Sequence, residues 1–180
     1  TGTAHPGQWN MACDEWLLES SLRGDGAAVR VYAWSRPTVS LGYFQRPDDL
    51  DTNPRLEGLD RVRRLSGGGA IVHHLEWTYS CVVPADDARN SPGNCLYAQI
   101  HQALVDEIRA TTKLDIPELG LRGQVPQDDR PALCFARAAA DDVVCGGHKL
   151  LGSAQRRRRG AILQHGSLLL ERSPHAPEFP

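Results

Sequence analysis

Two segments of the chain join a glycine-rich bend to an apolar run and carry a cationic side chain beside the bend. Residues 63–80 have the sequence RRLSGGGAIVHHLEWTYS, and residues 146–170 have the sequence GGHKLLGSAQRRRRGAILQHGSLLL. Glycine lets a ligand lie close to the backbone, and a neighbouring cation can fix an anion or polarise a carbonyl group. Together these features indicate a site for an activated acyl group.

The first bend consists of Ser66 and three glycines (67–69), and it follows Arg63 and Arg64. Backbone N–H groups in such a bend can face a carboxylate, phosphate or thioester oxygen. The ordinary alternative is a tight glycine turn. The two arginines and the nearby His73 favour the functional interpretation. Neither the phosphate-binding pattern GxxxxGK[ST] nor GxGxxG is present.

Lys149 and Cys134 are the residues best suited to acyl chemistry. Lys149 lies between Gly147 and Gly152, where its ammonium could hold an acyl carbonyl and lower the pKa of a nearby thiol. The alternative is an exposed strand lysine, which is the usual environment. Cys134 follows a proline-rich loop and could act as a thiolate nucleophile. The alternative is a buried apolar thiol, which we expect for the other four cysteines.

The remaining polar motifs have open interpretations. His165 could orient a ligand or Lys149, or it could be a satisfied core histidine. His73 and His74 are adjacent in a predicted strand and point to opposite faces, so we expect no two-histidine metal site. The run Arg156–Arg159 is predicted to be a solvated hairpin tip, and the alternative is docking to an acidic protein partner.

Composition indicates an ordinary single domain covering residues 1–180. The chain has 41% hydrophobic and 23% charged residues and a net charge of −2, which argues against a general nucleic-acid binder. No apolar run approaches the roughly 20 residues that cross a bilayer, and no signal peptide is visible. The five cysteines include no CxxC pair, so we expect neither a zinc site nor a disulfide framework, and we expect a cytoplasmic location.

Hydrophobic periodicity predicts an α+β fold, a mixed or antiparallel sheet with helices packed on one side. One helix is predicted over residues 10–24, with Asn10 as the N-cap, and another of about 18 residues from Ser91, with an apolar face of Leu96, Ile100, Leu104 and Ile108. Residues 115–133 are predicted to be a loop. The predicted strands are 28–34, 38–44, 61–65, 70–73, 78–83, 142–145, 149–154, 161–164 and 166–170.

Several segments together resemble the biotin/lipoate protein ligase superfamily, on its lipoate-attachment branch. They are NMACDEWLL, PTVSLGYFQ, RRLSGGGAIVHHLEWTYS, the CF pair at 134–135 and GHKLLGSAQRRRRGAILQHGSLLL, and they follow the family order from residue 10 to residue 170. The resemblance implies a core like that of biotin ligase and class II aminoacyl-tRNA synthetases. It also implies attachment of an octanoyl or lipoyl group to a lysine of a lipoyl carrier domain.

Two chemistries share this scaffold. The resemblance of Cys134 and Lys149 to the transferase motifs implies an octanoyltransferase, which takes octanoate from acyl carrier protein through a cysteine thioester and needs no cofactor. The alternative is a lipoate–protein ligase, which uses ATP, Mg²⁺ and lipoate and contacts the nucleotide through a residue equivalent to Arg64 and the stretch Gly69–Val72. A third interpretation is a non-catalytic carrier-binding relative, because His74 stands where both branches usually have Asp.

The resemblance implies a set of site residues and partners. Cys134 and Lys149 are the expected catalytic residues, and no metal ligand is expected in the transferase. The expected acyl- or nucleotide-binding residues are Arg64, Ser66, Gly67, Gly68, Gly69, Ala70, Ile71, Val72, His73, Gly152, Ser153, Ala154 and His165. The expected donor is acyl carrier protein, and the expected acceptors are lipoyl domains of 2-oxoacid dehydrogenases or the glycine cleavage H protein. Relatives continue beyond the QHGSLLL strand, so we expect a fragment or a minimal version.

Overall fold

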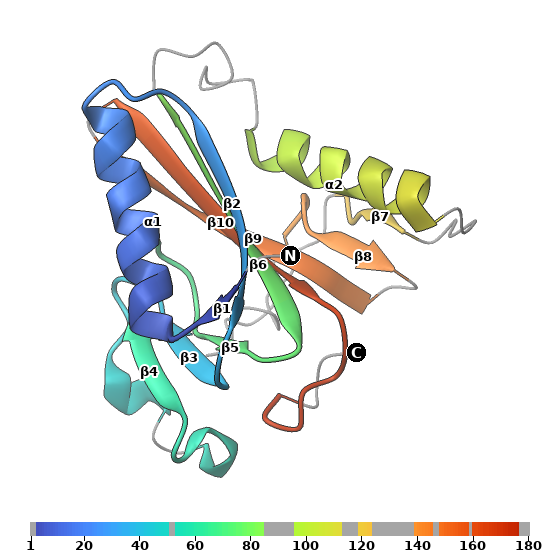
Figure 1. Ribbon diagram of the computed structural model, residues 1–180. Coiled ribbons are helices and arrows are strands. Elements are labelled where there is room, and N and C mark those ends of the chain that lie inside the picture. Colours follow the sequence, from blue (N-terminus) through green and yellow to red (C-terminus); the bar gives the residue numbers. More distant parts are fainter. Residues whose placement is uncertain are drawn as a thin grey trace.

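The computed structural model describes residues 3–50, 53–84, 96–112, 119–123, 139–145, 148–158 and 160–176. Helices and strands alternate irregularly along these residues (Figure 1), which confirms the predicted α+β class. The elements are β1 (Ala4–His5), α1 (Gly7–Leu22), β2 (Ala28–Trp34), β3 (Thr38–Leu41), two 3-10 helices (Pro47–Leu50 and Pro54–Leu56), β4 (Asp60–Arg63), β5 (Ile71–His73), β6 (Glu76–Pro84), α2 (Leu96–Thr112), β7 (Gly120–Leu121), β8 (Val143–Cys145), β9 (His148–Arg158) and β10 (Ala161–Leu169).

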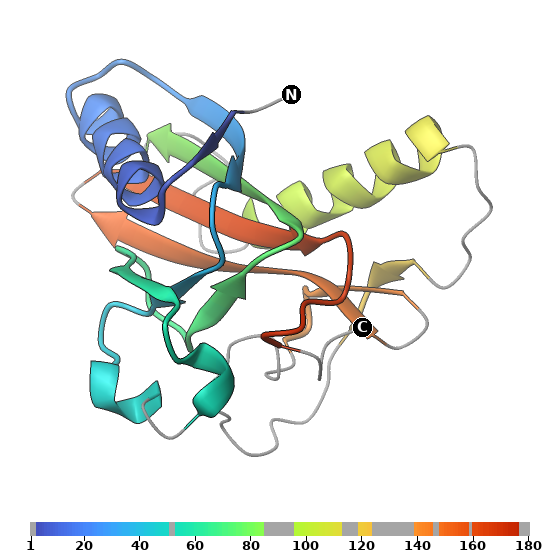
Figure 2. The ribbon, with the colours of Figure 1, turned by 60° about the horizontal axis from the view of Figure 1, so that its bottom comes forward.

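The described strands form two sheets. The larger has seven strands in the order β1-β2-β6-β10-β9-β8-β7, and the smaller has three in the order β4-β3-β5. Most neighbours are antiparallel, but β1 pairs with β2 and β3 pairs with β4 in parallel, so both sheets are mixed. The long hairpin of β9 and β10 forms the centre of the larger sheet together with β6 (Figure 2).

The two helices cover opposite faces of the larger sheet (Figure 1). Along β6, Val82 packs with Leu18 of α1, whereas its neighbours Cys81 and Val83 pack in the core that Leu96 of α2 completes. The expectation that the helices pack on one side is therefore wrong. Strand β6 alternates polar Thr78 and Ser80 with Tyr79 and Cys81, but both faces are buried, and the alternation alone does not show that a helix covers each of them.

Helix α1 begins at Gly7, three residues earlier than predicted. Asn10 is not its N-cap, because it lies inside the helix, is fully buried, and donates its side-chain amide to the carbonyls of His5 and Ala33. These carbonyls belong to β1 and β2, so Asn10 fastens the helix to the edge of the larger sheet. The other end agrees with the prediction, since Gly24 follows the helix with φ 98°.

The predicted apolar face of α2 is confirmed. Leu96 is buried, and Ile100, Leu104 and Ile108 pack against the same core. Residues 91–95, where we predicted the helix to start, lie outside the described residues. Within the described part of the chain, neither helix combines the length and the apolar character that crossing a bilayer would require.

Three strand predictions need correction. Strand β3 ends at Leu41 rather than residue 44, because the chain turns back over residues 42–45. The predicted loop 115–133 contains the short strand β7, and residues 115–118 and 124–133 lie outside the described residues. Strand β9 extends to Arg158, so Arg156–Arg158 belong to the strand rather than to the hairpin tip. Arg158 pairs with Glu19, and Arg156 lies over the ring of Tyr43.

Candidate active site

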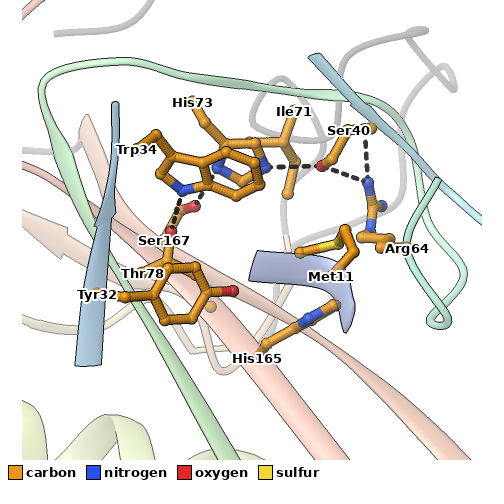
Figure 3. Close-up of a pocket in the computed structure, with 11 residues that line it drawn as sticks. Met11, Tyr32, Trp34, Ser40, Arg64, Ile71, His73, Thr78, His165 and Ser167 are labelled. Atoms are coloured by element: carbon orange, nitrogen blue, oxygen red, sulfur yellow. Dashed lines mark hydrogen bonds between the residues drawn. The ribbon is translucent and has the colours of Figure 1, made fainter. Parts of the chain in front are cut away.

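A small cavity lies on the α1 face of the larger sheet, where the smaller sheet packs against it (Figure 3). Its volume is about 10 Å³, close to the space of a single water molecule. Side chains from α1 and from both sheets line it. They are Met11, Tyr32, Trp34, Ser40, Arg64, Ile71, His73, Thr78, His165 and Ser167, together with Gly166. The wall thus combines hydrogen-bonding groups with an apolar surface.

Arg64 holds the SGGG bend (residues 66–69) from the inside. Its guanidinium donates to the carbonyls of Gly67 (2.9 Å) and Gly69 (2.6 Å), to the carbonyl and hydroxyl of Ser40 (2.8 and 3.1 Å), and to the hydroxyl of Ser66 (3.2 Å). These bonds engage all three nitrogens of the guanidinium. Arg64 is only 2% exposed, so its charge lies within the wall of the cavity.

Two glycines are required where the bend meets the turn after β3. Gly68 has φ 94°, a region that favours glycine. Gly42 lies so close to the carbonyl of Gly68 that a Cβ at residue 42 would overlap it. The two segments are also joined by the backbone N–H of Tyr43, which donates to the carbonyl of Ser66 (2.8 Å). Arg63 closes the turn from outside by donating to the carbonyls of residues 42, 43 and 45.

His73 faces the cavity and is fixed on every side. Its Nδ1 lies 2.6 Å from Oε1 of Glu76, its Nε2 lies 2.7 Å from the hydroxyl of Ser40, and its ring stacks on Trp34 at 3.8 Å. The next residue, His74, contacts Ser173 instead, which agrees with the expected opposite faces. Burial, with a further contribution from His175, lowers the pKa of His74 below its usual range.

His165 occupies the centre of the α1 face. Its Nε2 is hydrogen-bonded to the hydroxyl of Ser66, and its Nδ1 lies 3.0 Å from Oδ2 of Asp14. Asp14 also accepts from Tyr32 (3.1 Å) and from Ser80. Helix α1, strand β10 and the SGGG bend therefore meet at this histidine.

Lys149 is buried and paired, and it is not an exposed strand lysine. It is 8% exposed, and its ammonium lies 2.8 Å from Oδ2 of Asp142. Its aliphatic part lies across Gly152, where a Cβ would overlap Cε and come within 2.7 Å of Nζ. Glycine at residue 152 is therefore what gives the lysine side chain its space.

An irregularity in β9 decides which face Lys149 occupies. Val143 pairs with Leu151 and Val144 pairs with Lys149, so β9 contains one extra residue, Leu150. In a regular strand, residues 149 and 152 would face opposite sides. The extra residue instead brings Lys149 to the face of Gly152, which pairs with the cavity residue Ser167. Lys149 thus shares the sheet face on which the cavity lies.

Ser153 lies on the other face. Its hydroxyl is 2.6 Å from both the hydroxyl of Tyr79 and Nε2 of His101. Burial lowers the pKa of His101, opposed by the hydrogen bond to the carbonyl of Asp141, and burial also raises the pKa of Tyr79 well above its usual value. Although the sequence placed Ser153 in the binding set, its side chain belongs to the network beneath α2.

The other predicted residues divide between cavity and core. Arg64, Ile71, His73 and His165 line the cavity, and Ser66 bonds to two of them. Ala70 and Val72 pack into the core of the smaller sheet, and Ala154 pairs with His165 on the cavity face. Cys134, Phe135 and Gly147 lie outside the described residues. Of the other cysteines, Cys81 is buried and Cys13 and Cys145 are half-buried free thiols, while Cys95 is not among the described residues.

Sequence reasoning missed four polar residues of this region: Asp14, Ser40, Glu76 and Asp142. All four are buried, from 0 to 5% exposed. A signal existed for Asp14, because it follows Met11 by three residues and precedes Leu18 by four, which places it on the inward face of α1. Strand alternation alone did not distinguish the other three.

Comparison with known proteins assigns this arrangement to a family. The octanoyltransferase LipM of Moorella thermoacetica is 39% identical over 177 residues, which cover 94% of this chain and 63% of that protein. A candidate lipoate protein ligase from T. acidophilum matches with a TM-score of 0.70 and 26% identity, covering 94% of this chain and 68% of that one. A lipoate–protein ligase A bound with ATP matches with a TM-score of 0.66 and 26% identity, covering 96% and 67%.

The chain spans less than two thirds of the length of the Moorella protein. The family model of the lipoyl protein ligase A/B catalytic domain matches residues 6–176. With nearly all of its length inside that match, and with the glycine bend and lysine of the resemblance on one sheet face, the chain belongs to the lipoyl protein ligase A/B catalytic domain family.

Proposed function

We propose that the protein transfers an octanoyl group from an acyl thioester, carried by acyl carrier protein, to a lysine of a lipoyl carrier domain. The similarity to octanoyltransferases LipM supports this reaction. The observation that carries it is the position of Lys149, whose buried ammonium is held by Asp142 on the sheet face of the cavity. A lysine in this position can bind the carbonyl oxygen of an acyl group.

The proposed reaction has two displacements. The thiol of Cys134 loses its proton and attacks the carbonyl carbon of the donor thioester; a new C–S bond forms, the C–S bond to the donor breaks, and the donor thiol leaves with the proton that Cys134 gave up. The ε-amine of the acceptor lysine then attacks the acyl-enzyme, so that an amide forms and the thiol of Cys134 is regenerated. In both steps the ammonium of Lys149 donates to the carbonyl oxygen as negative charge develops on it. Neither displacement needs a cofactor.

The cavity supplies a starting point for the acyl chain. Its apolar wall includes Trp34 and Ile71, and its volume is about 10 Å³. An eight-carbon chain needs far more space, so binding requires the lining side chains to move apart. Each CH₂ group buried in this way contributes about 0.8 kcal/mol, which gives the site a means to select chain length.

Intact mass spectrometry tests the acyl-enzyme directly. After incubation with octanoyl-acyl carrier protein, we expect the chain to gain one octanoyl group that hydroxylamine removes. Cys134→Ala abolishes the adduct. Cys145→Ala, which removes a half-buried thiol on β8, the strand that pairs with β9, retains it. An adduct that persists in Cys134→Ala would overturn the assignment of the nucleophile. Absence of any adduct in the unmodified chain would favour a non-catalytic carrier-binding protein.

An ATP-dependent lipoate ligase is the second candidate, and the similarity to a ligase bound with ATP favours it. It needs Arg64 to contact the nucleotide. Arg64 already donates to Ser40, Ser66, Gly67 and Gly69, so contact with a nucleotide would require it to exchange some of these bonds. Lipoate-dependent exchange of pyrophosphate into ATP, undiminished in Cys134→Ala, would establish the ligase instead.

A further inference from the structure

Two hydrogen-bonded chains, each made of a carboxylate, a histidine and a serine, converge on Arg64. In the Asp14 chain, Asp14 bonds to His165, His165 bonds to Ser66, and Ser66 accepts from Nε of Arg64. In the Glu76 chain, Glu76 bonds to His73, His73 bonds to Ser40, and the Ser40 hydroxyl accepts from the terminal nitrogen of Arg64. Figure 3 shows the second chain running from His73 through Ser40 to Arg64.

All seven members are buried, with exposed fractions of 8% or less. In such a place a polar group that lacks a hydrogen-bond partner is costly, so each proton must face an acceptor. The two carboxylates lie at the outer ends of the chains and the guanidinium at their meeting point. Arg30 adds a second cation beside Asp14, at 3.5 Å from Oδ1.

The chemistry of the end groups fixes the direction of every bond. An ionised carboxylate only accepts and a guanidinium only donates. Nδ1 of each histidine must therefore carry the proton that the carboxylate accepts. In the neutral ring, Nε2 then accepts from the serine hydroxyl. The serine oxygen is left with lone pairs for Arg64, and these are the contacts that the structure contains.

We propose that Asp14 and Glu76 are positioning residues that hold His165 and His73 in the Nδ1–H tautomer. Through these tautomers they direct the hydroxyl protons of Ser66 and Ser40 toward the histidines, which leaves oxygen lone pairs for Arg64. Arg64 in turn holds the SGGG bend against the cavity. The consequence for acyl transfer rests on the proposed function. The tautomers themselves do not, so they can be tested separately.

The first test needs no variant. Long-range ¹H–¹⁵N correlation spectra of the ¹⁵N-labelled chain, with assigned histidine side chains, report which ring nitrogen carries the proton. We expect the Nδ1–H tautomer for His165 and His73 at mildly alkaline pH. Finding the Nε2–H tautomer at either residue in the unmodified chain would overturn the proposal for that histidine, whatever the protein proves to catalyse.

Asp14→Asn and Glu76→Gln have opposite expected effects on the two tautomers. Arg30, which can only donate, and Ser80 donate to Oδ1 of residue 14, whereas Tyr32, which donates to Oδ2, can also accept; an asparagine oxygen therefore takes the Oδ1 position, and its amide nitrogen faces His165 and Tyr32. His165 then changes to the Nε2–H tautomer. At Glu76, Oε1 accepts from His73, Thr78 and Ser167, whereas the buried Oε2 has no hydrogen-bond partner among the described residues. A glutamine keeps its oxygen at the Oε1 position, and His73 keeps its tautomer.

Ser80→Ala is the matched control for Asp14→Asn. It removes another buried hydrogen bond of Asp14 but leaves the carboxylate, so the tautomer of His165 stays unchanged. A change of tautomer in Ser80→Ala, or none in a folded Asp14→Asn, would show that Asp14 does not set it. If Asp14→Asn does not fold, the spectra of the unmodified chain and of Glu76→Gln still decide the proposal.

The activity measurement follows from the same contrast. We expect Asp14→Asn to lower kcat/KM for octanoyl transfer roughly 10- to 100-fold, the range typical when the group that orients a functional histidine is lost. Ser80→Ala lowers it less than about threefold, and Glu76→Gln, which keeps the tautomer of His73, lowers it less than Asp14→Asn does. Equal losses in all three folded variants would indicate a merely structural role. A chain without transferase activity but with the expected tautomers would reject the proposed function and leave the positioning intact.

Discussion

Gly152 makes room for the side chain of Lys149, because a Cβ at residue 152 would overlap the lysine Cε and lie within 2.7 Å of its ammonium nitrogen. The motif glycine and the motif lysine are thus a single packing unit. The ion pair between Lys149 and Asp142 forms only while this space stays empty. The spacing of the two residues in the sequence reflects this contact.

Gly152→Ala is expected to displace the ammonium of Lys149 and lower octanoyl transfer about 100-fold, since a shift of about 1 Å in a catalytic group has effects of that size. The measurement is kcat/KM together with the melting temperature. Gly120→Ala in β7 serves as the control, because a Cβ there meets nothing within 4 Å. A Gly152→Ala chain with full activity would mean that Lys149 does not act from this position.

Lys149→Met leaves the Asp142 carboxylate buried without its cation. Removal of one partner from a buried ion pair costs about 3–5 kcal/mol, so we expect a loss of that order in the free energy of unfolding, measured in urea. Adding Asp142→Asn to Lys149→Met restores much of the stability but none of the activity. A loss below about 1 kcal/mol in the single variant would contradict a buried pair.

His101 gives the protein an acid-sensitive stability. Burial lowers its pKa, while the hydrogen bond to the carbonyl of Asp141 opposes that shift. Because the pKa of the folded state is the lower one, the unfolded chain binds the proton first as the pH falls. The contribution of neutral, buried His101 to the free energy of unfolding is complete above about pH 6.5, the ordinary pKa of histidine. It is lost progressively below that pH.

We therefore expect His101→Gln to flatten the decline of the free energy of unfolding below about pH 6.5. Urea unfolding at a series of pH values measures this slope. Ala103→Ser, at an exposed residue of α2, changes no titratable group and leaves the slope as it is in the unmodified chain. Identical slopes in all three proteins would show that His101 does not cause the loss of stability at low pH.

Ile71→Ala enlarges the cavity and should widen the range of acyl chains that the enzyme transfers. Loss of this buried side chain costs about 2–5 kcal/mol of stability. Val72→Ala is matched to it, because Val72 is equally buried but packs into the core of the smaller sheet. We expect both variants to be less stable and only Ile71→Ala to change the chain-length profile in competition assays. An unchanged profile would place the acyl chain elsewhere.

Much of the fold could be predicted because local signals and packing agree. Leu96, Ile100, Leu104 and Ile108 face one core, as their spacing indicates. The start of α1 could not be predicted, because Asn10 forms hydrogen bonds with carbonyls of β1 and β2 that come near it only in the folded chain. The opposite placement of the two helices depends on which side of β6 each one covers, and the alternation of β6 separates its two faces without showing which helix lies on each.

Of the candidate site, the sequence indicated the cations and the glycines but not their partners. Arg64 and His73 were assigned by motif, whereas Ser40 and Glu76 are ordinary residues until the smaller sheet brings them within hydrogen-bond reach. The side chain of Ser153 lies on the face opposite the cavity, although the residue shares a motif with Gly152, because neighbouring residues of a strand face opposite sides. Cys134 stays a prediction, since it lies outside the described residues.

The single additional residue in β9 also limits how this strand can change. Substitutions at Leu150 alter only volume, but insertion of one further amino acid between Lys149 and Gly152, with the bulge kept, would send the lysine to the side of α2. Composition and charge of the chain would barely change, yet the ammonium would be separated from the cavity by the thickness of a sheet. Natural and engineered variants of this strand should therefore tolerate replacements far better than length changes.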